Sequence, residues 1–446
     1  MKTCVAAAII ALAAASSASA ELVARGVSHG LAGRDPAGRA YVAYLRGTTL
    51  VVARRVAARR WRNDVAARVA KGSSLAAFAV GRRGPVAVVL GPGERSVSVF
   101  HRRGHRWRTT PIERRVGPGA AVGWPGLALD RSGLPVVAYT RWRQRSRASQ
   151  LVLARLTARG VVRTERITRN GFPESYVPPP AAPIVMPNGR VHVVEAYGIS
   201  STVATIEWLP TRKSWVGQFI SGGVGDFPVG PMFGLATAAN VVYAAWTEAF
   251  LAWDEFPVTL ATHGRAIDAD FVLDRALTTG LALSRTGPQV VANEWVSGAQ
   301  LGMDTEDVLW AGTVTGRGGG EVDGWIDGIA ADARRDSRDL LLAGPRGISW
   351  FRVRGSLPRV MLAAEVQDDS SITLSGRVRG AARGGKVELF REWPGSAREV
   401  AGTARLSGGS FTFVDSPRPR PVLYRAVYTD PASGIPYARL LREPVG

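Results

Sequence analysis

Carboxylates next to aromatic side chains recur in the middle of this 446-residue chain. They occur in three short segments, each of which follows a run rich in Val and Ala. The segments contain Glu195 and Tyr197, then Trp246, Glu248, Trp253, Asp254 and Glu255, and finally Glu294 and Trp295. Aromatic faces stack on the apolar side of a sugar ring or on a cation, and carboxylates accept hydrogen bonds from hydroxyl groups. The three segments therefore predict a ligand-binding site.

Other interpretations of these residues stay open. Two of the carboxylates could hydrolyse a glycosidic bond if they lay about 5–5.5 Å or 6.5–9.5 Å apart. The plain alternative is that the glutamates are solvated residues at strand ends and the rings pack between strands. We assign no catalytic residue. The five histidines show no metal-ligand spacing and no phosphate-binding glycine loop occurs, so we expect no metal and no cofactor.

A second set of candidate binding residues is basic. The segment RWRQRSR contains Arg141, Trp142, Arg143, Arg145 and Arg147. Arginine forms paired hydrogen bonds with anionic groups and stacks on planar ones, which suits an anionic polymer. The alternative is a solvated basic surface in a chain whose arginines reflect a GC-rich coding sequence, because lysine occurs at only four positions.

The charge of the chain is large and unevenly distributed. The formal net charge is +21. Residues 31–170 contain 29 Arg and Lys against 6 Asp and Glu, whereas residues 241–330 contain 4 against 13. Composition drift alone does not explain this contrast. We therefore expect one side of the molecule to be basic and another to be acidic.

One phrase recurs along the chain, and its period predicts the architecture. LALDRSGLPVVAYTRW (127–142) has an apolar run, a tight polar turn and a second apolar run, which is typical of a β-hairpin. Seven such phrases place their turns, 46 to 56 residues apart, at Gly38, Gly84, Gly133, Gly189, Asn240, Gly287 and near Arg338. Glycine and asparagine suit tight hairpins because these need positive φ. A period near 50 residues with short strands is typical of a β-propeller.

Each unit continues with a third strand and a weaker fourth, which together make one four-stranded blade. We expect an all-β fold in which residues 21–356 form a seven-bladed β-propeller, with six or eight blades as alternatives. A strand near residues 21–26 is expected to close the ring by pairing with the last blade, which would cover its sheet edge. Tryptophans on the fourth strands are expected to pack between blades; they are Trp61, Trp107 and Trp215.

This topology places the candidate binding residues at one end of the blades. In a four-stranded blade, the loop after the second strand lies at the same end as the start of the first strand, and propellers generally bind ligands there. Glu195, Glu248 and Glu294 lie near the ends of second strands and are expected nearest the central funnel. The RWRQRSR segment occupies the corresponding loop of the third unit.

The first twenty residues read as a secretory signal peptide. Lys2 provides a positive start, an Ala-rich apolar run follows, and Ala18-Ser19-Ala20 is a small-residue cleavage site. The apolar run is too short to span a bilayer well, and no later stretch looks transmembrane. The single cysteine, Cys4, lies inside this segment. We therefore expect an exported, cysteine-free mature protein that is secreted or associated with the cell surface.

The composition changes near residue 356. Residues 357–446 contain short runs of alternating apolar residues separated by Gly, Pro and Ser turns about 10–14 residues apart. This pattern predicts a small β-sandwich. Through SGRVRG, KVELF, GGSFTF and YRAVY, it resembles the immunoglobulin-like modules that end many exported bacterial proteins. That resemblance implies a spacer or binding module.

The first part of the chain, through repeats such as LALDRSGLPVVAYTRW, resembles the sialidase-like (BNR-type) group of exported propellers. The resemblance covers about three quarters of the chain and implies architecture. The Asp-box pattern of that group, Ser-x-Asp-x-Gly-x-x-Trp, does not occur, and no arginine triad can be assigned. The resemblance therefore does not imply sialidase activity.

These observations predict a secreted, non-catalytic binding protein whose partner is an extracellular glycan or a protein. One alternative is a glycan-active propeller enzyme, either a glycoside hydrolase or a lyase. Another is a cell-surface assembly component that binds an anionic polymer through an Arg-rich face. We do not expect a nucleic-acid partner, and the sequence does not determine the oligomeric state. Propellers host all three functions, so the fold cannot choose between them.

Overall fold

The structure is a computed structural model. It describes residues 21–146, 148–160, 162–167, 178–197, 202–209, 214–221, 227–239, 241–249, 258–263, 267–273, 276–285, 287–297, 308–315, 319–332, 337–344, 346–354, 356–367, 371–382, 384–392, 396, 398–415, 422–431 and 435–441. The regular elements among these residues are β-strands and one 3-10 turn, η2 (Pro92–Glu94), so the fold is all-β as expected. Within the described part of the chain, no helix has the length and apolarity of a membrane span.

From β1 to β29, the described residues form seven antiparallel sheets that follow one another along the chain, and we number them in that order. The first contains β2 (Gly30–Arg34), β3 (Ala40–Arg46), β4 (Thr49–Ala57) and β5 (Arg60–Arg68). The second contains β6 (Ser74–Gly81), β7 (Gly84–Leu90), β8 (Val97–Arg103) and β9 (Arg106–Glu113). The third contains β10 (Ala120–Val122), β11 (Gly126–Leu129), β12 (Pro135–Arg143), β13 (Ala148–Leu156) and β14 (Val162–Ile167).

The remaining four sheets repeat this order. The fourth contains β15 (Ala181–Val185), β16 (Val191–Tyr197), β17 (Thr202–Leu209) and β18 (Ser214–Ser221). The fifth contains β19 (Phe227–Ala236), β20 (Val242–Ala249), β21 (Val258–His263) and β22 (Ile267–Leu273). The sixth contains β23 (Ala276–Ser284), β24 (Gly287–Ser297), β25 (Val308–Val314) and β26 (Gly320–Val322). The seventh contains β27 (Trp325–Asp332), β28 (Ser337–Gly344), β29 (Gly347–Arg354) and β1 (Glu21–Arg25).

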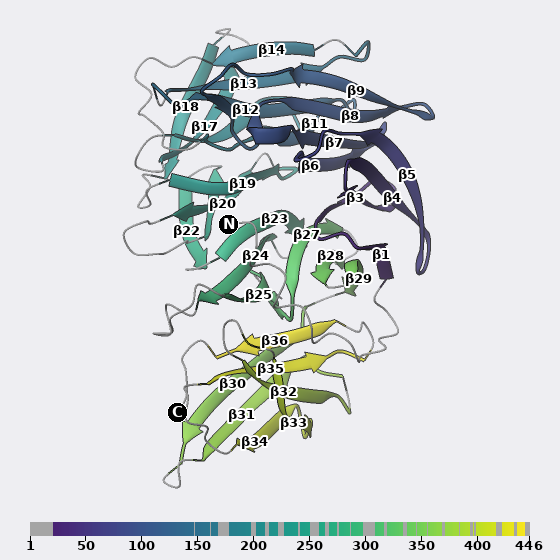
Figure 1. The fold of residues 1–446 in the computed structure, drawn as a ribbon. Helices are drawn as coiled ribbons and strands as arrows, with labels where there is room; N and C mark the ends of the chain where they lie inside the picture. The colour runs from purple at the N-terminus through teal and green to yellow at the C-terminus, as the bar shows by residue number, and fades with distance from the viewer. Residues whose placement is uncertain are drawn as a thin grey trace.

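The first strands of these sheets contact one another in a cycle. β2 contacts β6, the contacts continue in order through β11, β15, β19, β23 and β27, and β27 contacts β2 again. The first strands are therefore innermost, and the sheets fan outward from a common centre (Figure 1). Their small side chains allow this crowding: a Cβ atom on Gly30 would lie 2.9 Å from Ile348 of the seventh sheet. The fold is β-propeller-like.

The strand formed by residues 21–25 completes the seventh sheet, as the sequence predicted. β1 pairs antiparallel with β29, so the fourth strand of the last sheet in the cycle comes from before the first sheet in the sequence. Val23 and Ala24 are buried against Leu341, Ile348 and Trp350. Trp61 on β5 packs edge-to-face on Trp350, with ring centroids 5.4 Å apart. This confirms the predicted packing of Trp61 between sheets.

The turns between first and second strands confirm most of the predicted turn positions. Gly38, Gly84, Gly133, Gly189 and Gly287 have φ values of 79°, 108°, 75°, 86° and 125°. Asn240 lies outside the described residues. The hairpin predicted near Arg338 is present, but its turn comes earlier: β27 ends at Asp332 and β28 begins at Ser337, so Arg338 is a buried strand residue that pairs with Ala331. No glycine marks the turn of this degenerate seventh repeat, which explains the displacement.

The C-terminal strands form two layers around one core. β30 (Arg359–Val366), β31 (Ile372–Arg379) and β34 (Ser410–Asp415) form one sheet. β36 (Pro436–Leu440), β35 (Leu423–Thr429), β32 (Lys386–Glu392) and β33 (Glu399–Arg405) form the other. Leu374 and Phe411 of the first layer share a buried cluster with Leu389 and Tyr428 of the second. The sequence analysis missed β30, whose residues are largely exposed.

The second layer continues the sixth sheet. Val322 of β26 pairs with Tyr437 of β36, and Pro436 O accepts a hydrogen bond from Asp323 N at 2.8 Å. The resulting sheet of eight strands runs from β23 to β33, and Figure 1 shows the yellow C-terminal strands directly below β24 and β25. The short strand β26 would otherwise present an open edge, which the C-terminal strands cover.

Buried charges join the two parts at this seam. Asp323 accepts hydrogen bonds from Arg398 Nη1 at 2.6 Å and from Arg425 Nη1 at 3.2 Å, and Arg425 Nε donates to Glu392 at 2.9 Å. Arg425 is 1% exposed. Burial alone would raise the pKa of Asp323, but the two arginines lower it to about 2. One of the excess acidic residues of the segment 241–330, Asp323, thus forms ion pairs with arginines of the C-terminal strands.

Candidate functional site

The structure buries two of the predicted ligand-binding glutamates. Glu195 in β16 is 2% exposed and Glu294 in β24 is 4% exposed. Both face the preceding sheet, because side chains two residues apart share a face. Val193 packs on the third sheet, and Ala292 packs on Ala245 of the fifth. The Glu294 carboxylate accepts a hydrogen bond from Thr313 Oγ1 at 2.5 Å. Neither glutamate lies on an open funnel.

Trp246 is a core residue, so the prediction that it binds ligand is wrong. Its side chain is fully buried in a cluster with Ala182, Ile184, Met232 and Ala244, between the fourth and fifth sheets. The reason is geometric. Side chains stand roughly perpendicular to a sheet, and in a fan of sheets that direction points at the neighbouring sheet. Closeness to a strand end therefore did not imply closeness to the central axis.

The other predicted ligand-binding residues stay predictions. Tyr197, Glu248 and Trp295 have a described backbone in β16, β20 and β24, but their side chains lie outside the described part of the structure. Trp253, Asp254 and Glu255 lie entirely outside the described residues. The structure thus brings none of these six side chains into a described site.

The predicted basic segment forms the hairpin between β12 and β13. Arg141 Nε donates a hydrogen bond to Glu113 at 2.5 Å, so its charge is already balanced by a carboxylate. Trp142 is half-buried and pairs with Ala121 of β10, whereas Arg143 and Arg145 are exposed. Arg147 lies outside the described residues. Of the predicted cations, Arg143 and Arg145 are therefore the ones positioned to meet a polyanion.

A site that the sequence analysis did not predict lies where the first and seventh sheets meet. His29 immediately precedes β2, and its Nδ1 lies 3.1 Å from Asp327 Oδ1 of β27. The other oxygen of Asp327 accepts a hydrogen bond from Gly30 N at 3.0 Å. The His29 side chain is 68% exposed, whereas that of Asp327 is 4% exposed. A buried carboxylate thus orients an imidazole that faces solvent.

The two groups shift each other's titration. The hydrogen bond to Asp327 raises the pKa of His29, and the opposing effect of burial is smaller. Burial raises the pKa of Asp327, although His29 and the Gly30 N–H oppose that rise. When Nδ1–H donates to the carboxylate, Nε2 remains available to a ligand, as an acceptor in the neutral ring and a donor in the charged one.

Two half-buried indoles extend this site. Trp325, at the start of β27, contacts the His29 ring edge-to-face with centroids 6.4 Å apart. Trp310 of β25 packs edge-to-face on Trp325 at 4.8 Å. Both indoles are only partly buried. Arg425 Nη2 donates to Trp310 O at 3.0 Å, so the C-terminal strands support this corner.

The His29–Trp325 site, defined as His29, Asp327, Trp325 and Trp310, can offer a hydrogen-bonding nitrogen beside apolar ring surface. Neither residue type nor local spacing could reveal it, since His29 and Asp327 are 298 positions apart. The predicted closure of the ring could have indicated this site. Closure makes the first and seventh sheets neighbours, so a histidine before β2 and an aspartate in β27 become candidates for a hydrogen-bonded pair.

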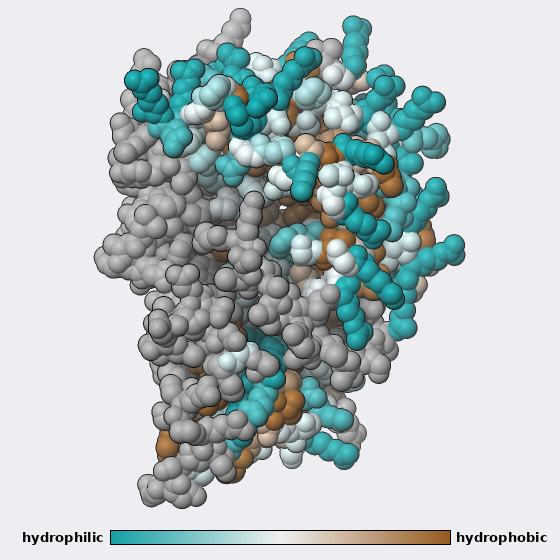
Figure 2. All heavy atoms as spheres, viewed as in Figure 1, coloured by the Kyte–Doolittle hydropathy of each residue, from teal (hydrophilic) through white to brown (hydrophobic). Residues whose placement is uncertain are grey.

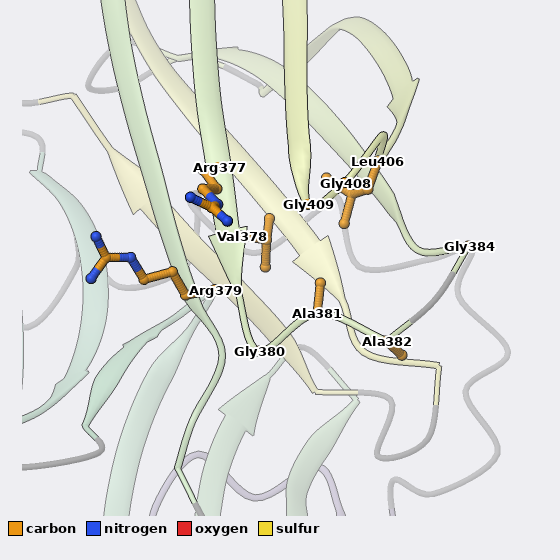
Figure 3. A pocket seen from close by; sticks show the side chains of 10 residues that line it. All are labelled: Arg377, Val378, Arg379, Gly380, Ala381, Ala382, Gly384, Leu406, Gly408 and Gly409. Carbon is orange, nitrogen blue, oxygen red and sulfur yellow. The ribbon is translucent and has the colours of Figure 1, made fainter.

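A hollow of about 430 Å³ lies in the C-terminal strands. It is lined by Arg377, Val378, Arg379, Gly380, Ala381, Ala382, Gly384, Leu406, Gly408 and Gly409, and the Arg379 side chain extends away from the others (Figure 3). The lining contains no carboxylate and no aromatic ring. Within the described part of the chain, no group of three or more His, Cys, Asp or Glu could hold a metal ion.

Comparisons with known proteins leave the family open. No protein-family model and no curated protein sequence matches the chain. Among solved structures, the SapL1 lectin in complex with alpha methyl fucoside has a TM-score of 0.42 and 12% identity, over 66% of this chain and 95% of that one. The exo-beta-1,3-galactanase 1,3Gal43A from Clostridium thermocellum has a TM-score of 0.41 and 11% identity, over 92% and 96%.

A protein from Lactobacillus plantarum is similar at the same level, with a TM-score of 0.41 and 12% identity over 72% of this chain and 87% of that one. All three TM-scores lie below 0.5 and all identities below 25%. These likenesses therefore carry no argument about ligand or activity, and the function is argued from the residues alone.

Proposed function

We propose that this chain is an exported seven-bladed β-propeller followed by an immunoglobulin-like module, and that it binds carbohydrate without turnover. In this proposal residues 1–20 are the signal peptide, 21–356 the propeller and 357–446 the module. The cyclic contacts of seven first strands support the blade count. The two-layered C-terminal strands support the module.

One observation carries the binding proposal: an exposed imidazole is fixed by a buried carboxylate beside partly exposed indoles. A sugar ring presents hydroxyl groups at its edge and an apolar C–H face, and the His29–Trp325 site offers partners for both. Orientation by Asp327 lowers the entropy that His29 loses on binding. The site lies at the end where first strands begin, which is the end predicted to bind ligand.

The positions of the glutamates favour binding over hydrolysis. A glycosidase needs two carboxyl groups facing one bond. Glu195 faces the boundary between the third and fourth sheets, whereas Glu294 faces that between the fifth and sixth. Because different sheets separate them and both are buried, these two do not support a shared pocket.

The His29–Asp327 pair favours a second candidate, a glycan lyase or hydrolase in which His29 acts as general base. A carboxylate that orients an imidazole is a common arrangement for proton transfer. In that case the protein would release new oligosaccharide ends over hours, and H29A would abolish the release. Binding with no product would exclude this candidate.

The first experiment is a thermal-shift screen of the purified protein against neutral and uronic oligosaccharides, followed by calorimetric titration of any sugar that stabilises it. A ligand at about 100 times its Kd raises stability by about 2.7 kcal/mol. We expect H29A and W325F each to weaken binding by about tenfold, which is the loss of one charged hydrogen bond or of stacking area.

Matched controls exist elsewhere in the chain. His105 is exposed in the β8–β9 hairpin, and Trp107 is a partly buried tryptophan of β9. H105A and W107F should leave sugar affinity within about twofold, because both are remote from the site. Unchanged affinity in H29A, or no sugar binding by the wild type, would contradict the proposal and favour a protein ligand.

A further inference from the structure

The opposite end of the sheets carries a second surface. In an antiparallel sheet built from consecutive strands, the turn between the first and second strands lies at the end away from the start of the first strand. His29 lies at that start. The first-to-second turns of the second, third and fourth sheets comprise residues 82–83, 130–134 and 186–190. We call the surface formed by these three turns the turn face.

Arginines occupy the turn face and reach from each turn to the next. Arg82, Arg83, Arg131 and Arg190 are all exposed. Arg83 Nε donates to Ser132 O of the neighbouring turn at 2.7 Å. A Cβ atom on Gly133 would lie 3.4 Å from Arg83, and one on Gly189 would lie 4.0 Å from Arg131 Nε. The three turns therefore lie side by side in an arc, with Arg83 between the first and second turns and Arg131 between the second and third.

Carboxylates of the described residues do not balance the charges of Arg82, Arg83 and Arg131. Among the described residues, Arg82, Arg83 and Arg131 form no ion pair, and the one acid in these turns, Asp130, accepts a hydrogen bond from Leu134 N at 2.8 Å. The first sheet differs: Arg34 pairs with Asp339, and Arg39 pairs with Asp35 at 2.6 Å. Like charges placed together repel, so an unbalanced arc is stabilised by an anionic partner.

The basic surface continues outward at the same end of the sheets. Turns between third and fourth strands also lie there, and they contain exposed Arg59 and Arg60, Arg106, and Arg159. Hydrophilic side chains gather along the edge of the molecule where β5 and β9 lie (Figure 2). The centres of the inner and outer turns of one sheet are two strand spacings of about 4.8 Å apart, so about 10 Å separates the inner arc from these outer hairpins, a distance that a polymer chain can span.

We propose that the turn face binds a linear anionic polysaccharide. The three turns contain no aromatic ring on which a nucleic-acid base could stack, so they recognise charge along a chain. The common chemistry is a polymer with regularly spaced sulfate or carboxylate groups. This site is independent of the His29–Trp325 site in position and ligand, and it differs from the Arg141–Arg147 segment at the other end of the sheets.

The test measures binding of fluorescent dextran sulfate and polygalacturonate, with neutral dextran and a 30-nucleotide oligo(dT) for comparison. We expect dextran sulfate, polygalacturonate or both to bind, which tells whether sulfate or carboxylate groups are recognised, and neutral dextran not to bind. Affinity should fall steeply between about 50 and 200 mM NaCl, because polyanion binding releases counterions. The triple variant R82S/R83S/R131S should lose at least about tenfold in affinity at low salt.

The control is R68S/R114S/R115S, which removes the same charge from exposed positions where the fourth strands of the first and second sheets end, at the opposite end of the sheets. The control variant should lower the affinity for the anionic polysaccharide by less than about threefold, and H29A should leave that affinity unchanged. An equal loss of affinity in both triple variants would mean that net charge alone determines binding, and it would overturn the proposal. Oligo(dT) binding as tight as the polysaccharide, or no binding of either anionic polysaccharide, would also overturn it.

Discussion

At the scale of single residues, the pair formed by His29 and Asp327 determines the chemistry of the candidate site. The hydrogen bond to the Asp327 carboxylate is the largest cause of the raised His29 pKa. A histidine with a raised folded-state pKa stabilises the fold below its unfolded value of about 6.5, and that stabilisation is lost as pH rises through the folded value. Acidic pH therefore strengthens this corner of the molecule.

The variant D327N tests this pairing. Asparagine keeps an acceptor for Gly30 N but removes the negative charge, so we expect the His29 pKa to fall. NMR titration of the ring protons measures it directly, with exposed His105 as the internal control. A His29 pKa that is the same in wild type and variant would show that Asp327 does not set it.

At the scale of elements, β1 is the strand on which ring closure depends. It covers the edge of β29, and its two faces differ: Val23 is 6% exposed, whereas Leu22 is 38% exposed. Because side chains alternate along a strand, Leu22 and Val23 are neighbouring positions of which one is exposed and the other buried, and their substitutions can be compared directly. The sequence predicted the pairing from the need to cover an edge, and the register with Trp350 and Ser349 came from the structure.

We expect V23S to destabilise the protein by about 1.5–3 kcal/mol, the value of burying a valine side chain. L22S should cost less than about 0.5 kcal/mol, because Leu22 lies on the outer face. Urea denaturation monitored by tryptophan fluorescence measures both. Equal effects of the two substitutions would mean that β1 does not close the ring in solution.

At the scale of the whole molecule, the seam between β26 and β36 makes the C-terminal strands part of the sixth sheet. A shared apolar cluster includes Val322 and Ile326 on one side and Leu357 and Tyr437 on the other. The charges of Asp323, Arg425 and Glu392 lie buried beside it. This continuity indicates one structural body, with the His29–Trp325 site and the turn face at opposite ends of its sheets.

We expect D323N to cost about 3–5 kcal/mol at pH 7, because it removes one of the two carboxylates that balance Arg398 and Arg425 in this buried network. The folded pKa of Asp323 is about 2, below its ordinary 3.8. Its contribution is therefore complete above about pH 4 and is lost as pH falls toward 2. Urea denaturation at pH 7 and pH 3 measures this, with exposed E365Q as the control. A constant difference between wild type and D323N at both pH values would contradict it.

Local sequence determined the strands and most of the turns. Apolar alternation and glycines at Gly38, Gly84, Gly133, Gly189 and Gly287 predicted hairpins correctly, because backbone conformation depends on neighbouring residues. The period predicted repeated four-stranded sheets for the same reason. The seventh repeat was predicted, but its turn was misplaced because no glycine marks it. β30 was missed because its apolar run, VMLAA, hides the alternation by which Val360, Leu362 and Ala364 face the core.

Tertiary structure alone decided which side chains meet. Glu195, Trp246 and Glu294 face neighbouring sheets, and no residue pattern within one strand states the direction of a sheet relative to the central axis. The pairing of His29 with Asp327 requires the ring to close over almost the whole propeller-like part. Sites formed between distant units depend on this closure, and for that reason the chemistry of this protein lies in contacts that its local sequence could not reveal.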